Sequence, residues 1–176
     1  AVGGAGNFAQ NAPAGKQITL PKDIPCVIAA AGVGADGNRP PFSSKGPCSW
    51  QGVKFYDDFP PDKPLLKPDV TTFNTDFPCW SRANFARARR LKEVWQDDKK
   101  EYGLYIGLRG NSFAGPHVAG VAALMLSANP DLPAWEVKRI LEETSKDLGA
   151  AGRDAEFGAG LVQALPAVQK ALSASR

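Results

Sequence analysis

A serine at the start of a long apolar segment is the residue whose type and setting best suit covalent chemistry. Ser112 follows a glycine turn at Gly110 and precedes an apolar run that ends at Ala128. The pattern predicts a buried helix over 113–128 with the Ser112 hydroxyl at its tip, where the helix dipole and free amides favour negative charge. An acyl-transfer nucleophile needs such stabilisation beside it. Local features alone favour a simpler interpretation, in which Ser112 or Asn111 only caps the helix.

The segment around this serine resembles the nucleophile motif of the subtilisin-like serine proteases. Residues 110–126 read GNSFAGPHVAGVAALML, and the usual form in that family is G-T-S-x-A-x-P-H-V-A-G followed by an apolar helix. Ser112 falls on the nucleophile. Asn111 stands where the family normally has Thr, and Gly115 replaces another small residue. Both are mild departures, because Asn can also cap a helix.

Further motifs agree with this family in the right order. They are Ala5-Gly6-Asn7 for A-G-N, PCVIAAA at 25–31, DG at 36–37, FSSKGP at 42–47, KPDV at 67–70 and FGAGLVQA at 157–164. The usual A-P-G after K-P-D-V is absent, and Thr71-Thr72-Phe73 stands there. The resemblance covers about 1–47, 64–73 and 104–172. We therefore interpret 1–176 as part of one catalytic domain, with family-variable insertions near 48–63 and 74–103.

The resemblance implies roles for a small set of residues. Ser112 would be the nucleophile, Asn7 would donate its side-chain amide to the oxyanion hole, and Gly4, Ala5 and Gly6 would line one wall of the pocket for the substrate side chain. The family's Asp and His motifs precede A-G-N, and neither is present here. The only histidine, His117, lies five residues beyond Ser112, about 140° away around the helix. We expect it to be a packed structural residue.

Two hypotheses follow for function. In the first, this chain is the C-terminal part of a subtilisin-like serine endopeptidase, and an N-terminal half supplies Asp and His as a companion chain or missing segment. The isolated chain would then be inactive, because serine needs a base to act as a nucleophile. The second is a non-catalytic, protease-like binding or scaffolding module. Because the nucleophile and the oxyanion residue are both intact, the enzyme is the favoured hypothesis.

The resemblance also implies an α/β fold, a doubly wound, mostly parallel sheet with helices on both faces, of which this chain holds the C-terminal part. The apolar run 26–31 predicts a buried parallel strand. Shorter strands are expected at 2–6, 67–73 and 104–108. Besides the helix over 113–128, amphipathic patterns predict helices over 133–144 and 161–173. A charge-rich segment, 81–101, is typical of an exposed helix on an insertion.

Composition and net charge limit the classes of partner that this chain is expected to bind. The chain has 176 residues and a net charge of +3, too small to indicate a nucleic acid or an acidic membrane as a partner. We expect a protein or peptide substrate, no cofactor and no metal in the site. Structural calcium, known in the family, cannot be read from these residues. An extracytoplasmic location is implied by the resemblance alone.

The three cysteines lack the spacing of a zinc site. Cys26 opens an apolar run and is expected to be a buried thiol. Cys48 and Cys79 lie in loop-like stretches, and the sequence leaves open whether they pair.

Overall fold

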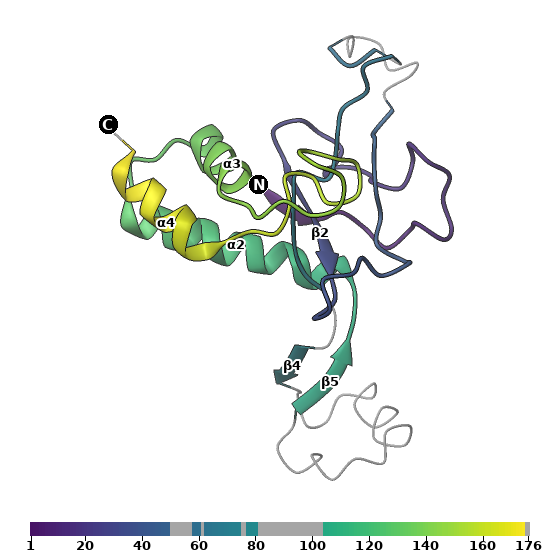
Figure 1. The fold of residues 1–176 in the computed structure, drawn as a ribbon, viewed down its shortest axis with the longest axis horizontal. Coiled ribbons are helices and arrows are strands. Elements are labelled where there is room, and N and C mark those ends of the chain that lie inside the picture. Colours follow the sequence, from purple (N-terminus) through teal and green to yellow (C-terminus); the bar gives the residue numbers. More distant parts are fainter. Residues whose placement is uncertain (50–57, 61, 75–76, 81–103, 175–176) are drawn as a thin grey trace.

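A three-stranded parallel sheet forms the centre of the computed structural model, which describes residues 1–49, 58–60, 62–74, 77–80 and 104–174. The strand order is β1 (Val2–Gly4), β2 (Ile28–Val33), β3 (Val70–Phe73) (Figure 1). Ala30 of β2 lies opposite Gly4 on one side and Val70 on the other. The expected α/β class with a parallel sheet is confirmed.

The central strand β2 forms from the longest apolar run before the helices, and all six of its residues are buried. It begins two residues later than the predicted 26–31. The amide of Val27 instead donates to the Ile24 carbonyl at 3.1 Å, in a turn that precedes the strand. Cys26 lies in this turn and is exposed, so the expectation of a buried thiol there is wrong.

A helical layer lies on one face of the sheet, in which α2 (Asn111–Ala128) packs against the strands and α3 (Ala134–Glu143) and α4 (Ala164–Ser173) pack beside α2 (Figure 1). They confirm the three predicted helices, with α4 beginning three residues later than expected. The core on this face joins strand and helix side chains, chiefly Ile28, Ala30, Val70, Val118, Met125, Ile140, Leu141 and Ala171.

Loops cover the other face of the sheet in the described part of the chain, where the resemblance implied helices on both faces. A second cluster of Ala5, Ile18, Ala31, Cys48 and Leu65 forms its core. Cys48 is a free, buried thiol, so it makes no disulfide with Cys79. Desolvation, with the nearby negative charge of Asp23, raises the pKa of Cys48 to about 12. This thiol is therefore a packing residue rather than a reactive one.

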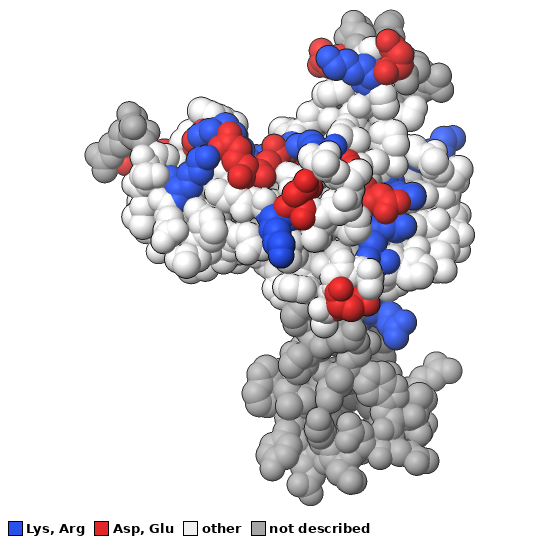
Figure 2. All heavy atoms as spheres, viewed as in Figure 1, with Lys and Arg blue, Asp and Glu red and all other residues white. Residues whose placement is uncertain are grey.

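Helix α2 is buried on one side only, which corrects the expectation of a helix buried all round. Its inner side chains, such as Ala114 and Val118, are fully buried against the sheet. On its outer side Leu124 is 56% exposed and Leu126 is 40% exposed, because no described segment packs over them. Figure 2 shows an uncharged surface along the lower side of the helical layer, where α2 runs in Figure 1.

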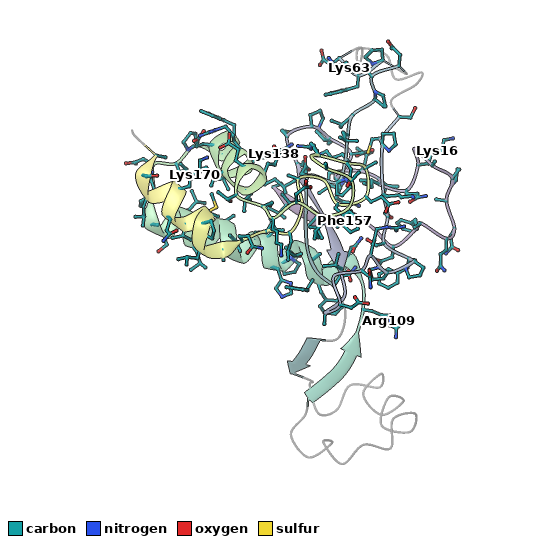
Figure 3. The ribbon with its side chains drawn as sticks, in the orientation of Figure 1. Lys16, Lys63, Arg109, Lys138, Phe157 and Lys170 are labelled. Carbon is teal, nitrogen blue, oxygen red and sulfur yellow. The ribbon has the colours of Figure 1, made fainter. Side chains whose placement is uncertain are left out.

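Two antiparallel strands, β4 (Phe77–Trp80) and β5 (Leu104–Leu108), extend away from the body of the molecule (Figure 1). The strand predicted at 104–108 is confirmed. The helix predicted over 81–101 lies outside the described residues. β5 returns the chain to the body through Arg109, directly before α2 (Figure 3). Across the described ranges, no helix combines the length and the apolar character needed to span a bilayer.

A buried carboxylate connects the sheet to the helical layer. Asp69 is fully buried and accepts from the Ala29 amide at 2.7 Å and from Lys67 Nζ at 2.6 Å. Its other oxygen lies 2.8 Å from Lys138 of α3 and 3.0 Å from Arg153 (Figure 3 labels Lys138). Desolvation lowers the pKa of Lys67, and the Asp69 charge opposes that shift. Asp69 thus contacts three cationic side chains, of which only Lys67 is fully buried.

Replacing this carboxylate by its neutral isostere should destabilise the fold strongly. Asp69→Asn leaves Lys67 buried without a counter-charge, so we expect a loss of about 3–5 kcal/mol in the free energy of unfolding, measured by urea denaturation. Glu143→Gln, which removes an exposed partner of Arg139 and Lys170, should change it far less. Equal effects of the two substitutions would contradict a central role for Asp69.

Candidate active site

The N-terminus of α2 places Ser112 at an exposed position in the first helical turn. Gly110 precedes the helix with φ +144°, a conformation that favours glycine. The helix begins at Asn111, and no side chain caps it from the Gly110 position. Neither Ser112 nor Asn111 therefore acts as the helix cap, which removes the simplest alternative explanation for this serine.

Glycines bring the end of β1 into backbone contact with this helix. A Cβ atom on Gly4 would lie 2.0 Å from the Asn111 carbonyl oxygen and 3.2 Å from the Ser112 nitrogen. A Cβ atom on Gly115 would lie 2.9 Å from the Gly4 nitrogen. The distances of 2.0 Å and 2.9 Å are shorter than real Cβ contacts allow. The absence of side chains at Gly4 and Gly115 is therefore what lets β1 approach the nucleophile so closely.

Asn7 reaches the same helix end from the loop after β1. Its Oδ1 accepts a hydrogen bond from the Asn111 amide at 2.9 Å, across 104 positions of sequence. Oδ1 is the acceptor in this bond, so the amide hydrogens of Asn7 are on Nδ2. Nδ2 lies beside Gly110, where a Cβ atom would be 3.2 Å away. The side chain is exposed. Asn7 and the residue directly before Ser112 are thus in contact, while the oxyanion role of Asn7 stays a prediction.

Asn111 itself points inward and is fully buried. Its Nδ2 donates to the Gly6 carbonyl at 2.7 Å and to Ser43 Oγ at 3.0 Å. Its Oδ1 accepts from Asn74 Nδ2 at 2.6 Å, and Ser43 Oγ lies 3.3 Å away. Sequence reasoning missed Asn74 entirely. The one signal for it was the departure from A-P-G just before it in the sequence.

The three residues expected to form a pocket wall lie where β1 ends beside α2. Ala5 is fully buried and its amide donates to the Ala30 carbonyl at 2.8 Å. Gly6 has φ +118°, and its carbonyl accepts from the Ser44 amide at 2.9 Å. The second serine of the FSS motif therefore holds the A-G-N segment in place. The substrate-binding role of Gly4, Ala5 and Gly6 stays a prediction.

His117 is exposed, not packed in the core as expected. Its position on α2 lies outside the buried stripe of the helix, which includes Ala114, Val118 and Met125. Its Nδ1 lies 3.3 Å from the Phe73 carbonyl oxygen at the end of β3. This contact joins the helix to the strand, in keeping with a structural role, which stays a prediction.

Lysines close to the site motifs in sequence are engaged elsewhere. Lys22 Nζ is 3.1 Å from the Leu20 carbonyl, and Lys45 Nζ is 2.5 Å from Glu156. Lys16 lies on an outer loop, on the opposite side of the molecule from α4 (Figure 3). In the part of the chain that the structure describes, no group of three or more His, Cys, Asp or Glu side chains could hold a metal ion.

These features define an α/β protein with an exposed serine at a helix start and an asparagine amide beside it. The family model for the subtilases, the S8 peptidases, matches residues 1–160. The chain belongs to the subtilase family.

Individual relatives agree with this assignment. A probable subtilase-type serine protease of Deinococcus radiodurans is 30% identical over 146 residues, which cover 81% of this chain and 17% of that protein. Subtilisin DY of Bacillus licheniformis is 29% identical over 170 residues, covering 96% of this chain and 46% of that protein. The self-cleaved protease domain of PatA has a similar fold, with a TM-score of 0.61, 20% identity, and coverage of 99% of this chain and 51% of that one. The chain spans about half or less of these proteins.

The glycine contact between β1 and α2 can be tested by adding one methyl group. Gly4→Ala forces the start of α2 away from β1, so we expect a destabilisation of about 1–3 kcal/mol by urea denaturation. Gly3→Ala is the matched control on the same strand, because its Cβ would meet the flexible Lys22 side chain at 3.0 Å. A Gly4→Ala protein as stable as the Gly3→Ala protein would contradict the contact.

Proposed function

We propose that this chain is the nucleophile-bearing part of a subtilisin-type serine endopeptidase, which hydrolyses peptide bonds through an acyl-enzyme. Ser112 is the nucleophile, and Asn7 with the Ser112 backbone amide forms the oxyanion hole. The observation that carries the proposal is the hydrogen bond from the Asn111 amide to Asn7 Oδ1. This hydrogen bond supports an orientation of the Asn7 side chain in which the donor hydrogens on Nδ2 lie beside the nucleophile.

The proposed reaction uses the chemistry of both helix and loop. The Ser112 hydroxyl attacks the scissile carbonyl, a histidine takes its proton, and the carbonyl oxygen becomes negatively charged. The amide of Ser112 belongs to the first turn, whose N–H groups have no partner within the helix. Together with Asn7 Nδ2 it would supply two donors to that oxygen. Such preorganised donors contribute most where charge develops.

Substrate would bind along the end of β1. Gly4, Ala5 and Gly6 form one wall of the pocket for the residue before the scissile bond, and the extended peptide pairs with a strand edge. The close approach of Gly4 to the helix supports this, because a Cβ atom on Gly4 would lie only 3.2 Å from the Ser112 nitrogen. The substrate class is protein or peptide, as the family implies.

The general base and its orienting carboxylate are supplied from outside this chain. The single histidine, His117, is five residues beyond Ser112 on the same helix, and its ring contacts Phe73 at the end of β3. Lys22 and Lys45 are engaged away from the helix start. We propose that an N-terminal part, as a companion chain or a preceding segment, brings the Asp and His.

The outer side of α2 supports such a companion. It holds no charged residue, and Pro116, Ala119, Gly120, Ala123 and Leu124 on it are all exposed. A Cβ atom on Gly120 would have no heavy atom within 4 Å. Exposed apolar surface of this kind marks an interaction site. We place the N-terminal part on this surface. An extracytoplasmic location is supported by relatives such as the extracellular serine protease of Serratia marcescens.

A complementation assay tests the proposal. The isolated chain should not hydrolyse a fluorogenic peptide, because it lacks a base for Ser112. Addition of the N-terminal part should give turnover and labelling of Ser112 by a fluorophosphonate, followed by mass spectrometry. Ser112→Ala in the complete protein is the control and should show neither.

Two outcomes would contradict this proposal. Turnover with Ser112 labelling by the isolated chain, in a sample free of a second chain, would show that the base lies within it. An unlabelled Ser112 in the complete, folded protein would favour a non-catalytic, protease-like module.

The oxyanion role of Asn7 has its own test. Asn7→Leu in the complete protein should lower kcat by about 10²–10³-fold with KM little changed, the size known for such a donor in subtilisin. Asn11→Leu, an exposed position in the same loop, should keep kcat within about 2-fold of the unmodified protein. Equal kcat values for the two variants would remove Asn7 from the oxyanion hole.

A further inference from the structure

We propose that Asn111 is a positioning residue for the reaction, which aligns the oxyanion-hole residue with the nucleophile, and that Asn74 is its required partner. The inference rests on the proposed function and deepens it. It concerns the position at which this chain departs from the nucleophile motif it otherwise resembles.

Asn111 holds the segment that contains Asn7 at two points. Its main-chain amide donates to Asn7 Oδ1 at 2.9 Å, and its side-chain Nδ2 donates to the Gly6 carbonyl at 2.7 Å. Both bonds come from the residue bonded covalently to Ser112. The position of Asn7 relative to Ser112 is therefore held through Asn111, by its main-chain amide and by its buried side chain.

The Asn111 side chain has its hydrogen-bonding capacity filled. An amide offers two donor hydrogens and an oxygen with two lone pairs. The donors go to Gly6 and Ser43, and the oxygen has Asn74 Nδ2 at 2.6 Å and Ser43 Oγ at 3.3 Å. Threonine, the usual residue here, has a single hydroxyl and cannot replace these contacts. A buried polar group without its partner is costly.

Asn74 is built into the same buried unit. Its main-chain carbonyl accepts from the Gly110 amide at 2.9 Å, and its own amide donates to Val33 at 2.9 Å. Its side chain occupies the space beside Gly32, where a Cβ atom would lie 2.2 Å from Asn74 Cβ. Within the described residues, Asn74 Oδ1 is buried without a hydrogen-bond partner. Among the described residues, the Asn74 side chain is held by the bond from its Nδ2 to Asn111 Oδ1.

One departure from the resembled motifs is thus in contact with the residue that directly follows another. Asn111 replaces the usual Thr, and Asn74 directly follows the Thr71-Thr72-Phe73 that stands for A-P-G. Their side chains share a 2.6 Å hydrogen bond at zero exposure. Without Asn111, Asn74 Nδ2 would lose its partner, and without Asn74, Asn111 Oδ1 would keep only Ser43 Oγ at 3.3 Å. We infer that the pair acts as one unit.

Restoring threonine should therefore impair the enzyme rather than improve it. In the complete protein, Asn111→Thr should lower kcat by about 10-fold or more with KM within about 2-fold, because a displaced donor loses its alignment with the transition state. Asn74→Ala should cause a similar loss. In the Asn111→Thr background, Asn74→Ala should then add less than about 2-fold, because coupled residues are not additive.

A matched control separates positioning from general destabilisation. Asn129 ends the same helix, and its side chain donates to the Ala171 carbonyl at 3.0 Å, away from Ser112. Asn129→Thr should lower the thermal midpoint but keep kcat within about 2-fold. The rate of fluorophosphonate labelling at Ser112 is the second readout and should follow kcat in all variants.

The outcomes distinguish this inference from the proposed function. If Ser112 of the unmodified protein is labelled and Asn111→Thr keeps an undiminished kcat, the positioning role alone is overturned. An equal loss of kcat in Asn129→Thr, or fully additive effects of Asn74→Ala and Asn111→Thr, would overturn it as well. Absence of Ser112 labelling in the unmodified, folded protein would overturn the proposed function and this inference with it.

Discussion

The backbone contact between the end of β1 and the first turns of α2 is the constraint on which the rest of the structure depends. It brings together segments 104 positions apart, and it exists only because Gly4 and Gly115 lack side chains. Once the two backbones touch, the Asn111 amide meets Asn7 and the Asn111 side chain enters the interior. The geometry of the candidate site therefore follows from packing, and its polar groups then fix that packing to one arrangement.

The two sides of the helical layer differ in their interactions, with buried charge on the inner side and exposed apolar surface on the outer side. On the inner side, the buried Asp69 contacts three cations and joins β2 and β3 to α3, so its removal would leave the buried Lys67 without a counter-charge. On the outer side, α2 presents exposed Leu124 and Leu126 without any charged residue. Exposed apolar surface of this kind is typical of an interaction site. The inner side of α2 is packed against the sheet, whereas its outer side is uncovered among the described residues.

Sequence reasoning succeeded where one local pattern decides the outcome. The continuous apolar runs located β2 and α2, and the motifs located Ser112 and Asn7 in contacting segments. It failed where the answer depends on distant neighbours. Cys26 ends outside the sheet because a turn intervenes, and His117 is exposed because the buried stripe of α2 passes beside it. The role of Asn74 could not be predicted, because it depends on a contact with Asn111, 37 positions away in the sequence.

The contact between Asn74 and Asn111 changes how the departures from the family pattern are interpreted. Taken one at a time, Asn111 and the missing A-P-G support a domain that has lost its function. In the structure, Asn111 Oδ1 accepts from Asn74 Nδ2 at full burial, and the pair supports the segment that carries Asn7. The Asn111 side chain, although it departs from the usual threonine, has its donors and its acceptor paired with Gly6, Ser43 and Asn74. The departures therefore favour an alternative way of building the same site over its loss.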